Sequence, residues 1–390
     1  MFETDEKWIW QSKNYPNFAF SANDFKTLLD KVQTNGEAIN KIIADNKISV
    51  NLLDARINSL TNEIVNSAAI ESEILKRESV RNSLRKKLDE NFDEFNDKHA
   101  TRQSDNYASI LLDTNLNKKP LTKERLHGWH NCLFEGGYSG LRKIDIAKFR
   151  SCEMQVASNK IGREKVYYEA PLPQDIDKNM RAFFDYCNDK SVNSFVKSAV
   201  AHLWFVVIHP YDDGNGRLAR AIADFLLPNE NIKLYSISTQ INSHRKKYYE
   251  ILEKTTANNS ACDISQWLEW HLNIINWAIK SGMDELNKLV FKTAFWDTFR
   301  NINLSKSQQR ALNKLLDIGA GNFNGKFDIK KYTSFAKVDD ATAQRELDEL
   351  VKIGALVQNE PNSFTIWHSG NISAFNTPDD CIRKPKGPRR

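Results

Sequence analysis

An apolar run that ends at a proline constrains the fold of this chain more than any other feature of its sequence. Residues 200–208 are almost all apolar, which predicts a buried helix, and Pro210 cannot continue that helix. A glycine-containing loop follows, and residues 217–227 then place three apolar side chains on one helical face: Leu218, Ile222 and Phe225. The sequence therefore predicts two helices joined by a short loop, with His209 at the end of the first.

The loop and the start of the second helix form a candidate anion site. Backbone N–H groups at a helix start have no partner within the helix, and the helix dipole favours negative charge there. Two arginines three residues apart project from the same side of the first turn, where they oppose the dipole unless an anion lies nearby. Phosphate is the commonest such anion. The candidate phosphate-binding residues are Gly214, Asn215, Gly216, Arg217 and Arg220.

Two other residues of the loop add reactive groups. A carboxylate beside a polyphosphate site, here Asp213, is the usual ligand for Mg²⁺, and His209 titrates near neutral pH. A base, a metal ligand and an anion site together favour transfer of a phosphorus group to a hydroxyl. Taken singly, each residue has a structural alternative, since a histidine at a helix end is commonly a cap and Asp-Gly-Asn-Gly is commonly a surface turn.

Residues 209–220 resemble the signature of the Fic family, His-Pro-Phe-x-Asp/Glu-Gly-Asn-Gly-Arg-x-x-Arg, at every position except Tyr211. The tyrosine keeps the aromatic ring but adds a hydroxyl that needs a partner if it is buried. The resemblance implies that His209 acts as the base toward a target hydroxyl, that Asp213 binds Mg²⁺, and that the anion site holds the phosphates of ATP.

The same resemblance implies a fold and a reaction. The fold is mainly α, with a Fic-type helical core and a β-hairpin flap. The reaction is transfer of AMP from ATP to a Ser, Thr or Tyr hydroxyl of a protein target or of the enzyme itself, with pyrophosphate leaving. Two alternatives stay open: a Fic enzyme with another donor, by phosphoryl or other nucleotidyl transfer, and a nucleotide-sensing DNA-binding regulator.

A helical segment rich in small residues, 66–72, resembles the inhibitory motif of many Fic proteins, Ser/Thr-x-x-x-Glu-Gly/Asn. Ser67 and Glu71 occupy its diagnostic positions, whereas Ser72 departs from Gly or Asn. The resemblance implies that Glu71 pairs with Arg220 and blocks the productive position of the ATP γ-phosphate. The alternative is an ordinary exposed glutamate on a helix.

A β-hairpin is predicted by two short tracts of β-forming residues, 152–157 and 165–170, with turn-forming residues between them. In the Fic family such a hairpin is the flap over the active site, where the target segment pairs as an added strand. The expected docking residues are Lys165, Val166 and Tyr167. A surface hairpin without function is the alternative.

Two adjacent tyrosines, Tyr248 and Tyr249, lie on a predicted helix beyond the signature. A tyrosine near an adenine pocket supplies stacking area. Because adjacent helix residues point in different directions, we expect at most one of them to face the nucleotide.

Changes in sequence pattern divide the chain into four parts. Residues 1–95 predict a helical N-terminal domain whose aromatic start resembles the domain that accompanies a Fic subfamily, and 96–300 predict the catalytic domain. Residues 301–370 predict a small α+β domain that resembles a winged helix, with helices at 307–316 and 340–353 and a final hairpin. Its second helix is rich in acidic residues, which favours docking of a protein over DNA. Residues 371–390 predict a basic, disordered tail.

The charge of the chain comes from this tail. The last eight residues carry five basic and no acidic side chains, and the rest balances fifty basic against fifty acidic residues. The sequence has no apolar stretch long enough to span a membrane, no apolar segment typical of a signal peptide, and five scattered cysteines that predict reduced, mostly buried thiols. We therefore expect a cytoplasmic protein without membrane contact; a homodimer stays open.

Overall fold

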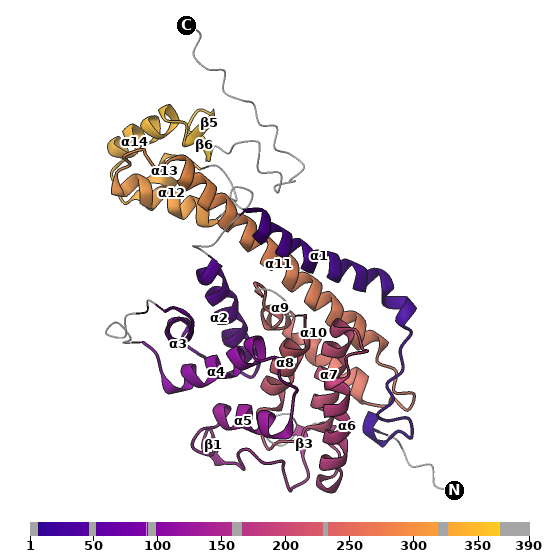
Figure 1. Ribbon diagram of the computed structural model, residues 1–390. Coiled ribbons are helices and arrows are strands. Elements are labelled where there is room, and N and C mark those ends of the chain that lie inside the picture. Colours follow the sequence, from indigo (N-terminus) through magenta and orange to yellow (C-terminus); the bar gives the residue numbers. More distant parts are fainter. Residues whose placement is uncertain are drawn as a thin grey trace. The chain divides into compact units, whose positions relative to one another are not determined.

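The computed structural model describes residues 7–46, 52–90, 92, 99–157, 166–228, 233–318 and 327–366 of the 390. Most of these residues are helical, as expected for a mainly α protein (Figure 1). Contacts divide the chain into two compact units, Met1–Lys41 with Ser49–Met283 and Ile42–Ile48 with Asp284–Arg390. This division differs from the boundaries expected at residues 95 and 300, because the N-terminal helices pack with the helices of the signature.

The first unit begins with two 3₁₀ turns and a series of helices: η1 (Ile9–Gln11), η2 (Ala22–Phe25), α1 (Lys26–Asn46), α2 (Leu52–Ile70), α3 (Arg77–Leu88), α4 (Arg102–Leu116) and α5 (Lys123–Leu133). Two hairpins and a 3₁₀ turn follow: β1 (Tyr138–Ser139), β2 (Arg142–Lys143), β3 (Gln155–Ala157), β4 (Val166–Glu169) and η4 (Pro173–Asp175). The remaining helices are α6 (Ile176–Asn188), α7 (Ser194–Ile208), α8 (Asn215–Leu226), α9 (Ile237–Ser243), α10 (Arg245–Thr256) and α11 (Ser265–Thr298), which continues into the second unit.

Helix α7 is the central helix of the first unit. It is buried along nearly its whole length and packs against α6 and α8 (Figure 1). The side-chain oxygen of Asn193 begins it by accepting hydrogen bonds from the N–H groups of Phe195 and Val196. Helix α7 ends at Ile208 and α8 begins at Asn215, so the predicted helix–loop–helix is confirmed. The loop is thereby held between two packed helices.

Helix α2 is anchored to the start of α9 through a buried glutamate. The Glu63 carboxylate accepts hydrogen bonds from the Ser236 hydroxyl at 2.7 Å and from the Ser238 N–H at 3.0 Å. A carboxylate is stabilised at such a helix start by the unpaired N–H groups. Because α2 carries Ser67 and leads directly into Glu71, this contact sets the position of the predicted inhibitory segment.

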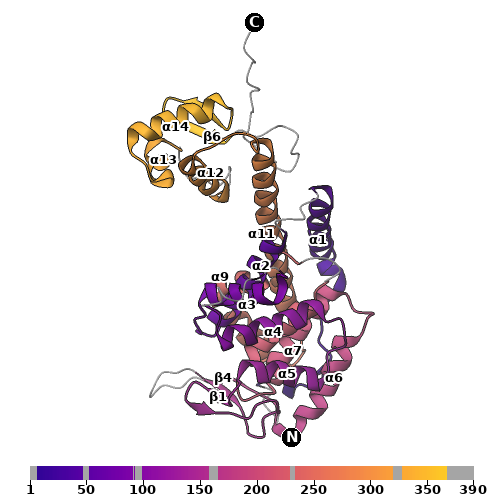
Figure 2. The same cartoon turned by 60° about the vertical axis from the view of Figure 1, so that its left-hand side comes forward.

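The predicted β-hairpin is confirmed, because β3 pairs antiparallel with β4, while its turn lies outside the described residues. Its role as a flap stays a prediction. A second hairpin, β1 with β2, was not predicted, because each strand has only two residues and shows no alternation. Its turn contains Gly140 at a φ of 56°, a left-handed conformation that glycine adopts without strain. Figure 2 shows β1 and β4 at the same end of the first unit.

The aromatic start of the chain contacts the flap strand β4. The indole N–H groups of Trp8 and Trp10 donate to the Glu169 carboxylate at 3.0 Å and the Glu169 carbonyl at 2.7 Å. The Trp8 ring also packs edge-on against Tyr168, with ring centroids 5.4 Å apart. The N-terminal segment therefore supports the flap.

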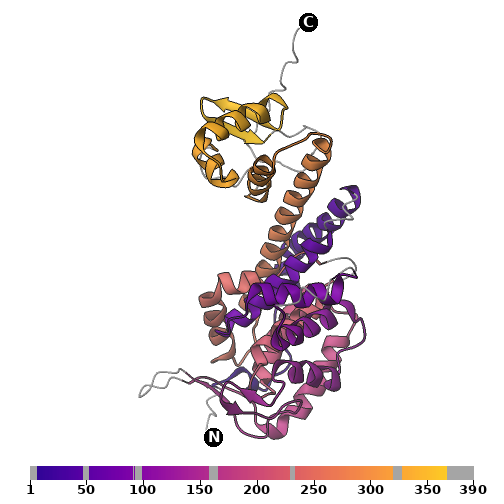
Figure 3. The ribbon, with the colours of Figure 1, turned by 90° about the vertical axis from the view of Figure 1, so that its left-hand side faces the viewer.

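The second unit, in orange and yellow in Figures 1 and 3, contains helices and a final hairpin: α12 (Lys306–Ile318), α13 (Ile329–Ala336), α14 (Asp340–Lys352), β5 (Leu356–Glu360) and β6 (Ser363–Ile366). Its core also includes the end of α11. Helix α13 was not predicted, although Asp328 caps it by accepting from the Lys331 N–H. Glu346 is buried and accepts from Ser305 and Tyr332, so it adds nothing to the acidic surface expected on α14. The predicted tail, 371–390, lies outside the described residues.

Among the helices that the structure describes, none combines the length and the apolar character that a bilayer crossing requires. Four cysteines lie in the described ranges, and none of these four forms a disulfide there. Cys187 and Cys262 are buried as expected, whereas Cys132 is half-buried and Cys152 is exposed.

Candidate active site

His209 lies at the end of α7 in a left-handed conformation, with a φ of 50°. Its Nδ1 is 3.2 Å from the Val206 carbonyl oxygen. Since a carbonyl oxygen only accepts, Nδ1 carries the proton, and in the neutral ring the lone pair stands on Nε2. The helix end therefore selects the tautomer in which Nε2 can accept a proton.

Burial lowers the pKa of His209 to about 4. The bond to the Val206 carbonyl opposes this shift, the positive charge of Arg150 adds to it, and the carboxylates of Glu71 and Asp213 oppose it. The imidazole is thus neutral at pH 7 and available as a base.

Tyr211 is wholly buried, and its hydroxyl has the partner that its burial requires. The hydroxyl lies 2.8 Å from His127 Nδ1, and the ring stacks on His130 with centroids 4.0 Å apart. The Asn215 side chain fixes the loop from the other side, because it accepts from the Tyr211 N–H at 3.0 Å and donates to the Tyr211 carbonyl at 2.7 Å. The Asn215 side chain is therefore engaged by the Tyr211 backbone, and its backbone N–H is the group available for the phosphate-binding role that the sequence predicts.

The start of α8 has the geometry of an anion site. Gly214 precedes it with a φ of 81°, and a Cβ there would lie 2.6 Å from the Phe134 ring, so a side chain is excluded. The first backbone bond into the helix runs from the Leu218 N–H to the Gly214 carbonyl. The N–H groups of Asn215, Gly216 and Arg217 therefore precede the first intrahelical bond.

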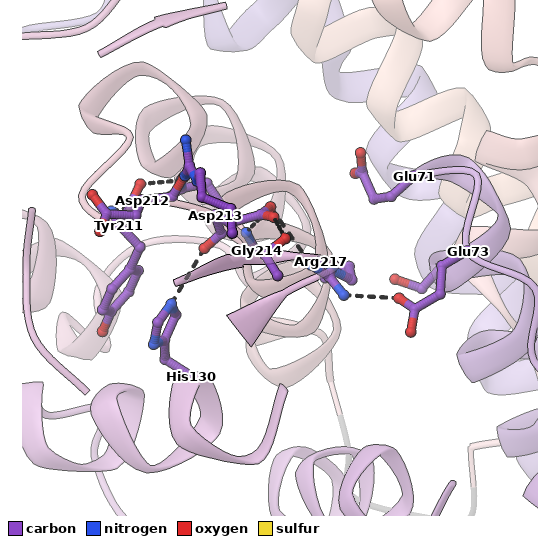
Figure 4. Close-up of polar contacts among 12 residues, drawn as sticks. Glu71, Glu73, His130, Tyr211, Asp212, Asp213, Gly214 and Arg217 are labelled. Atoms are coloured by element: carbon purple, nitrogen blue, oxygen red, sulfur yellow. Dashed lines mark hydrogen bonds and ion pairs between the residues drawn. The ribbon is translucent and has the colours of Figure 1, made fainter. Parts of the chain in front are cut away.

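Asp213 keeps an exposed carboxylate in the same loop, with 41% of its side chain accessible. It accepts from the Ser139 hydroxyl and, at 2.5 Å, from the Gly214 N–H (Figure 4). Across the described ranges, no three His, Cys, Asp or Glu side chains converge on a metal site. A single exposed carboxylate fits Mg²⁺, which commonly takes one or two carboxylates and completes its shell with substrate oxygens and water.

Arg220 is bound by both residues of the predicted inhibitory motif. Its Nε donates to the Ser67 hydroxyl and its Nη2 to the Ser67 carbonyl and to Glu71 Oε1, each at 2.9 Å. The Arg220 side chain is only 1% exposed. Glu71 Oε1 also lies 2.2 Å from the position a Cβ on Gly216 would take, so the carboxylate lies against the start of α8.

Ser72 adopts the left-handed conformation, with a φ of 63°, that Gly or Asn would take at this position. The N–H groups of Ser72 and Glu73 bond to the carbonyls of Ala69 and Ala68, which is the hydrogen-bond pattern of a Schellman cap. The Arg245 guanidinium donates to the Ser72 hydroxyl at 2.9 Å. The departure from the motif therefore leaves the cap and the Glu71–Arg220 pair intact.

A serine in this conformation carries strain that glycine avoids. We expect Ser72→Gly to be more stable to unfolding than Ser72→Ala by about 1 kcal/mol, because alanine keeps the steric cost and also loses the hydroxyl. Urea denaturation of the full chain measures the difference. Equal stability of the two variants would contradict this account of the cap.

A second glutamate, Glu73, was missed by the sequence reasoning. Its Oε2 accepts from Arg217 Nη1 at 2.8 Å and from the Tyr107 hydroxyl at 2.5 Å, and its Oε1 accepts from Gln103 at 2.5 Å (Figure 4). Each arginine of the signature is thus paired with its own glutamate. The available signal was a second carboxylate two residues after Glu71, just beyond the helix end.

The two tyrosines of α10 differ in exposure. Tyr248 is buried, with its hydroxyl 3.0 Å from His202 Nε2 and its ring stacked on Trp270, so it presents no exposed ring face in this structure. Tyr249 is 42% exposed and donates to the Ile70 carbonyl at 3.1 Å. Only Tyr249 is left as the candidate for adenine stacking.

The flap residues are placed in part. Val166 is half-buried, Tyr167 is 37% exposed, and Lys165 lies outside the described residues. Among the strands that the structure describes, β3 and β4 pair only with each other. Docking of a target segment as an added strand on this hairpin stays a prediction.

Comparison with known proteins agrees with this geometry. Residues 120–227 match the Fic/DOC family, and residues 8–89 match a domain of unknown function, DUF4172. The chain is 34% identical over 114 residues to a protein adenylyltransferase Fic of Nematostella vectensis, covering 28% of this chain and 24% of the relative. It is 35% identical over 104 residues to a protein of the same name of Aedes aegypti, covering 25% of this chain and 20% of the relative. The match thus spans about a quarter or less of these relatives.

A solved structure supports the fold over a longer range. A Fic family protein of Desulfovibrio desulfuricans G20 aligns with a TM-score of 0.52 over 91% of this chain and 99% of its own, at 16% identity. At that identity the likeness shows the fold alone.

Proposed function

Because residues 120–227 of this chain form a Fic domain, we propose that the protein is an adenylyltransferase that moves AMP from ATP to a Ser, Thr or Tyr hydroxyl of a protein. One observation carries the proposal: a carboxylate oxygen of Glu71 lies against the start of α8, over Gly216 and hydrogen-bonded to Arg220. The site thus binds an anion of the chain's own, in the place where a phosphate oxygen of a nucleotide would bind. The relatives named protein adenylyltransferase support the choice of AMP.

The chemistry follows from the tautomer of His209. Nε2 accepts the proton of the target hydroxyl while the hydroxyl oxygen forms a bond to the α-phosphorus of ATP. The bond from that phosphorus to the bridging oxygen of the β-phosphate breaks, and pyrophosphate leaves with the electron pair. The N–H groups at the start of α8 and the two arginines stabilise the phosphate charge, since such donors act strongly where water is excluded.

Asp213 would hold Mg²⁺ together with the phosphate oxygens of ATP. The ion would supply positive charge that offsets the charge of the triphosphate.

The inhibitory contact is the second part of the proposal. Glu71 engages the Arg220 guanidinium that would hold the outer phosphate, so ATP must displace the carboxylate or bind in a position unfit for in-line attack. The Glu73 carboxylate pairs with the Arg217 guanidinium, so a phosphate would have to displace this carboxylate as well. In this conformation, both cations of the signature are neutralised by the chain itself.

Incubation with ATP labelled on its α-phosphate, magnesium and a cell lysate tests the function. Transfer of label to protein, with an added mass of AMP on a hydroxyl residue, supports adenylylation. Label only from the γ-phosphate, or an adduct from another nucleotide, would assign another donor. Salt-sensitive DNA binding without any labelling would instead favour a nucleotide-sensing regulator.

Asp213→Ala should lose most of the magnesium dependence of nucleotide binding. The nucleotide keeps the arginines but loses the carboxylate that would hold the ion. Calorimetric titration of ATP with and without magnesium measures the effect, and Asp212→Ala is the matched control, since the Asp212 carboxylate accepts from the Asp145 N–H. Unchanged magnesium dependence in Asp213→Ala would remove this residue from the metal site.

A further inference from the structure

Arg150 is a buried cation that the proposed chemistry does not use. Only 3% of it is exposed, and within the described residues its guanidinium donates to backbone carbonyls and pairs with no carboxylate. A buried charge is costly unless its hydrogen-bonding groups are satisfied, so an arginine in such a place has a defined set of partners.

Those partners come from three segments of the site. Nε donates to the His209 carbonyl at 2.8 Å, Nη1 to the Cys152 carbonyl at 2.7 Å, and Nη2 to the Pro171 carbonyl at 2.6 Å. The backbone N–H of Arg150 also donates to the Pro210 carbonyl at 2.9 Å. Cys152 precedes β3 and Pro171 follows β4, so one side chain joins both stems of the flap to the loop of His209.

The contact also stabilises the end of α7. The last carbonyls of a helix lack partners and carry the negative end of its dipole, which favours a cation there. His209 has a φ of 50°, a conformation that a residue with a side chain keeps only when its surroundings hold it. Arg150 therefore binds the carbonyl oxygens of two successive residues, His209 and Pro210.

We propose that Arg150 is a positioning residue of this site, which fixes the His209 backbone relative to both flap stems so that a hydroxyl presented along the flap meets Nε2. The effect of Arg150 on catalysis rests on the proposed function. Its structural role, joining the three segments, rests on the observed contacts alone. Tyr168 of β4 adds a bond from its hydroxyl to the Val207 carbonyl at 2.6 Å, whereas Arg150 binds the carbonyl of His209 itself.

The chain offers a matched control in Arg125. Its guanidinium is also largely buried and donates to the carbonyls of Asp113 and Asn117, at 2.9 and 3.0 Å. Unlike Arg150, it bonds to no residue of the loop or the flap in the described part of the chain. Loss of either arginine should lower the stability of the fold, but only loss of Arg150 should change the position of His209 relative to the two flap stems.

The test compares Arg150→Met, Arg150→Lys and Arg125→Met in the full chain. We expect Arg150→Met to lower the maximal labelling rate, at saturating ATP and magnesium with a lysate as acceptor, by about 10²-fold, because a displacement of about 1 Å can cost that much. The ATP affinity should stay within about twofold, since no phosphate-binding residue is touched. Arg150→Lys should recover about tenfold, and Arg125→Met should keep the parent rate.

Amide hydrogen exchange gives a readout that does not need activity. In Arg150→Met, residues 152–157, 166–171 and 209–214 should lose protection together, whereas Arg125→Met should leave them protected. Equal labelling rates of Arg150→Met and Arg125→Met would overturn the catalytic part of the proposal, as would a parallel loss of ATP affinity. If the parent transfers no nucleotide, the proposed function fails, and the exchange experiment alone then decides whether Arg150 joins these segments.

Discussion

Replacing His209 with alanine is expected to lower protein labelling by about 10²-fold or more, because the target hydroxyl loses its proton acceptor. ATP binding should stay nearly unchanged, since the phosphate groups are held at the start of α8. Initial labelling rates and calorimetric ATP titration measure the two effects. His244→Ala, which removes an exposed histidine of the same unit, should label like the parent. Retained labelling in His209→Ala would refute the assignment of the base.

The pH dependence of this step has a definite sign. The neutral imidazole is the base, and the pKa of His209 is lowered to about 4, so the active form persists as the pH falls from 7 to 5. The pH profile of kcat/KM reports the pKa values of the free enzyme. Protonation of His209 should therefore lower kcat/KM only as the pH approaches 4. A midpoint near 6.5, the ordinary value for histidine, would show that burial does not control this group.

Glu71→Gly is expected to raise labelling by about tenfold to 10²-fold. Charged hydrogen bonds contribute about 1.5–3 kcal/mol, and each 1.4 kcal/mol of blocked binding that is released gives about a tenfold gain. The substitution removes the carboxylate partner of Arg220, whose bonds to Ser67 remain, and clears the start of α8 above Gly216. Arg220→Ala added to Glu71→Gly should remove the gain, because the freed guanidinium is the group that would hold the γ-phosphate.

Two further variants separate this effect from a general loosening of the helix end. Glu78→Gly makes the same chemical change at an exposed position of α3 and should leave the rate at the parent value. Glu73→Gln weakens the ion pair of Arg217 but keeps that of Arg220. Alone it should raise the labelling rate only slightly, and combined with Glu71→Gly it should raise the rate beyond that of Glu71→Gly. If Glu71→Gly labels no faster than the parent at saturating ATP and magnesium, the segment around Glu71 is structural only.

The helix–loop–helix at the centre of the site could be predicted because its determinants are local. An apolar run, a proline and two glycines set the end of α7 and the start of α8 whatever surrounds them. The hydrogen-bond partners of the Asn215 and Tyr248 side chains could not be predicted from neighbouring residues in the sequence. Both carry polar groups that suit a ligand, and the structure uses them inside the protein, for the Tyr211 backbone and for His202.

The sequence by itself predicted the residues of the candidate site: His209, Asp213 and the two arginines follow one another within twelve positions, and the predicted inhibitory motif around Glu71 stands in a continuous segment. Only the tertiary structure decided which carboxylate meets which arginine, since Glu73 lies 144 residues from Arg217 and Glu71 lies 149 residues from Arg220. Arg150 likewise acquires its role only when the flap stems and the end of α7 come together. Local conformational preferences depend on residues that are neighbours in the sequence. The partners of a buried charge instead depend on which distant backbone groups the packed core brings within hydrogen-bonding distance.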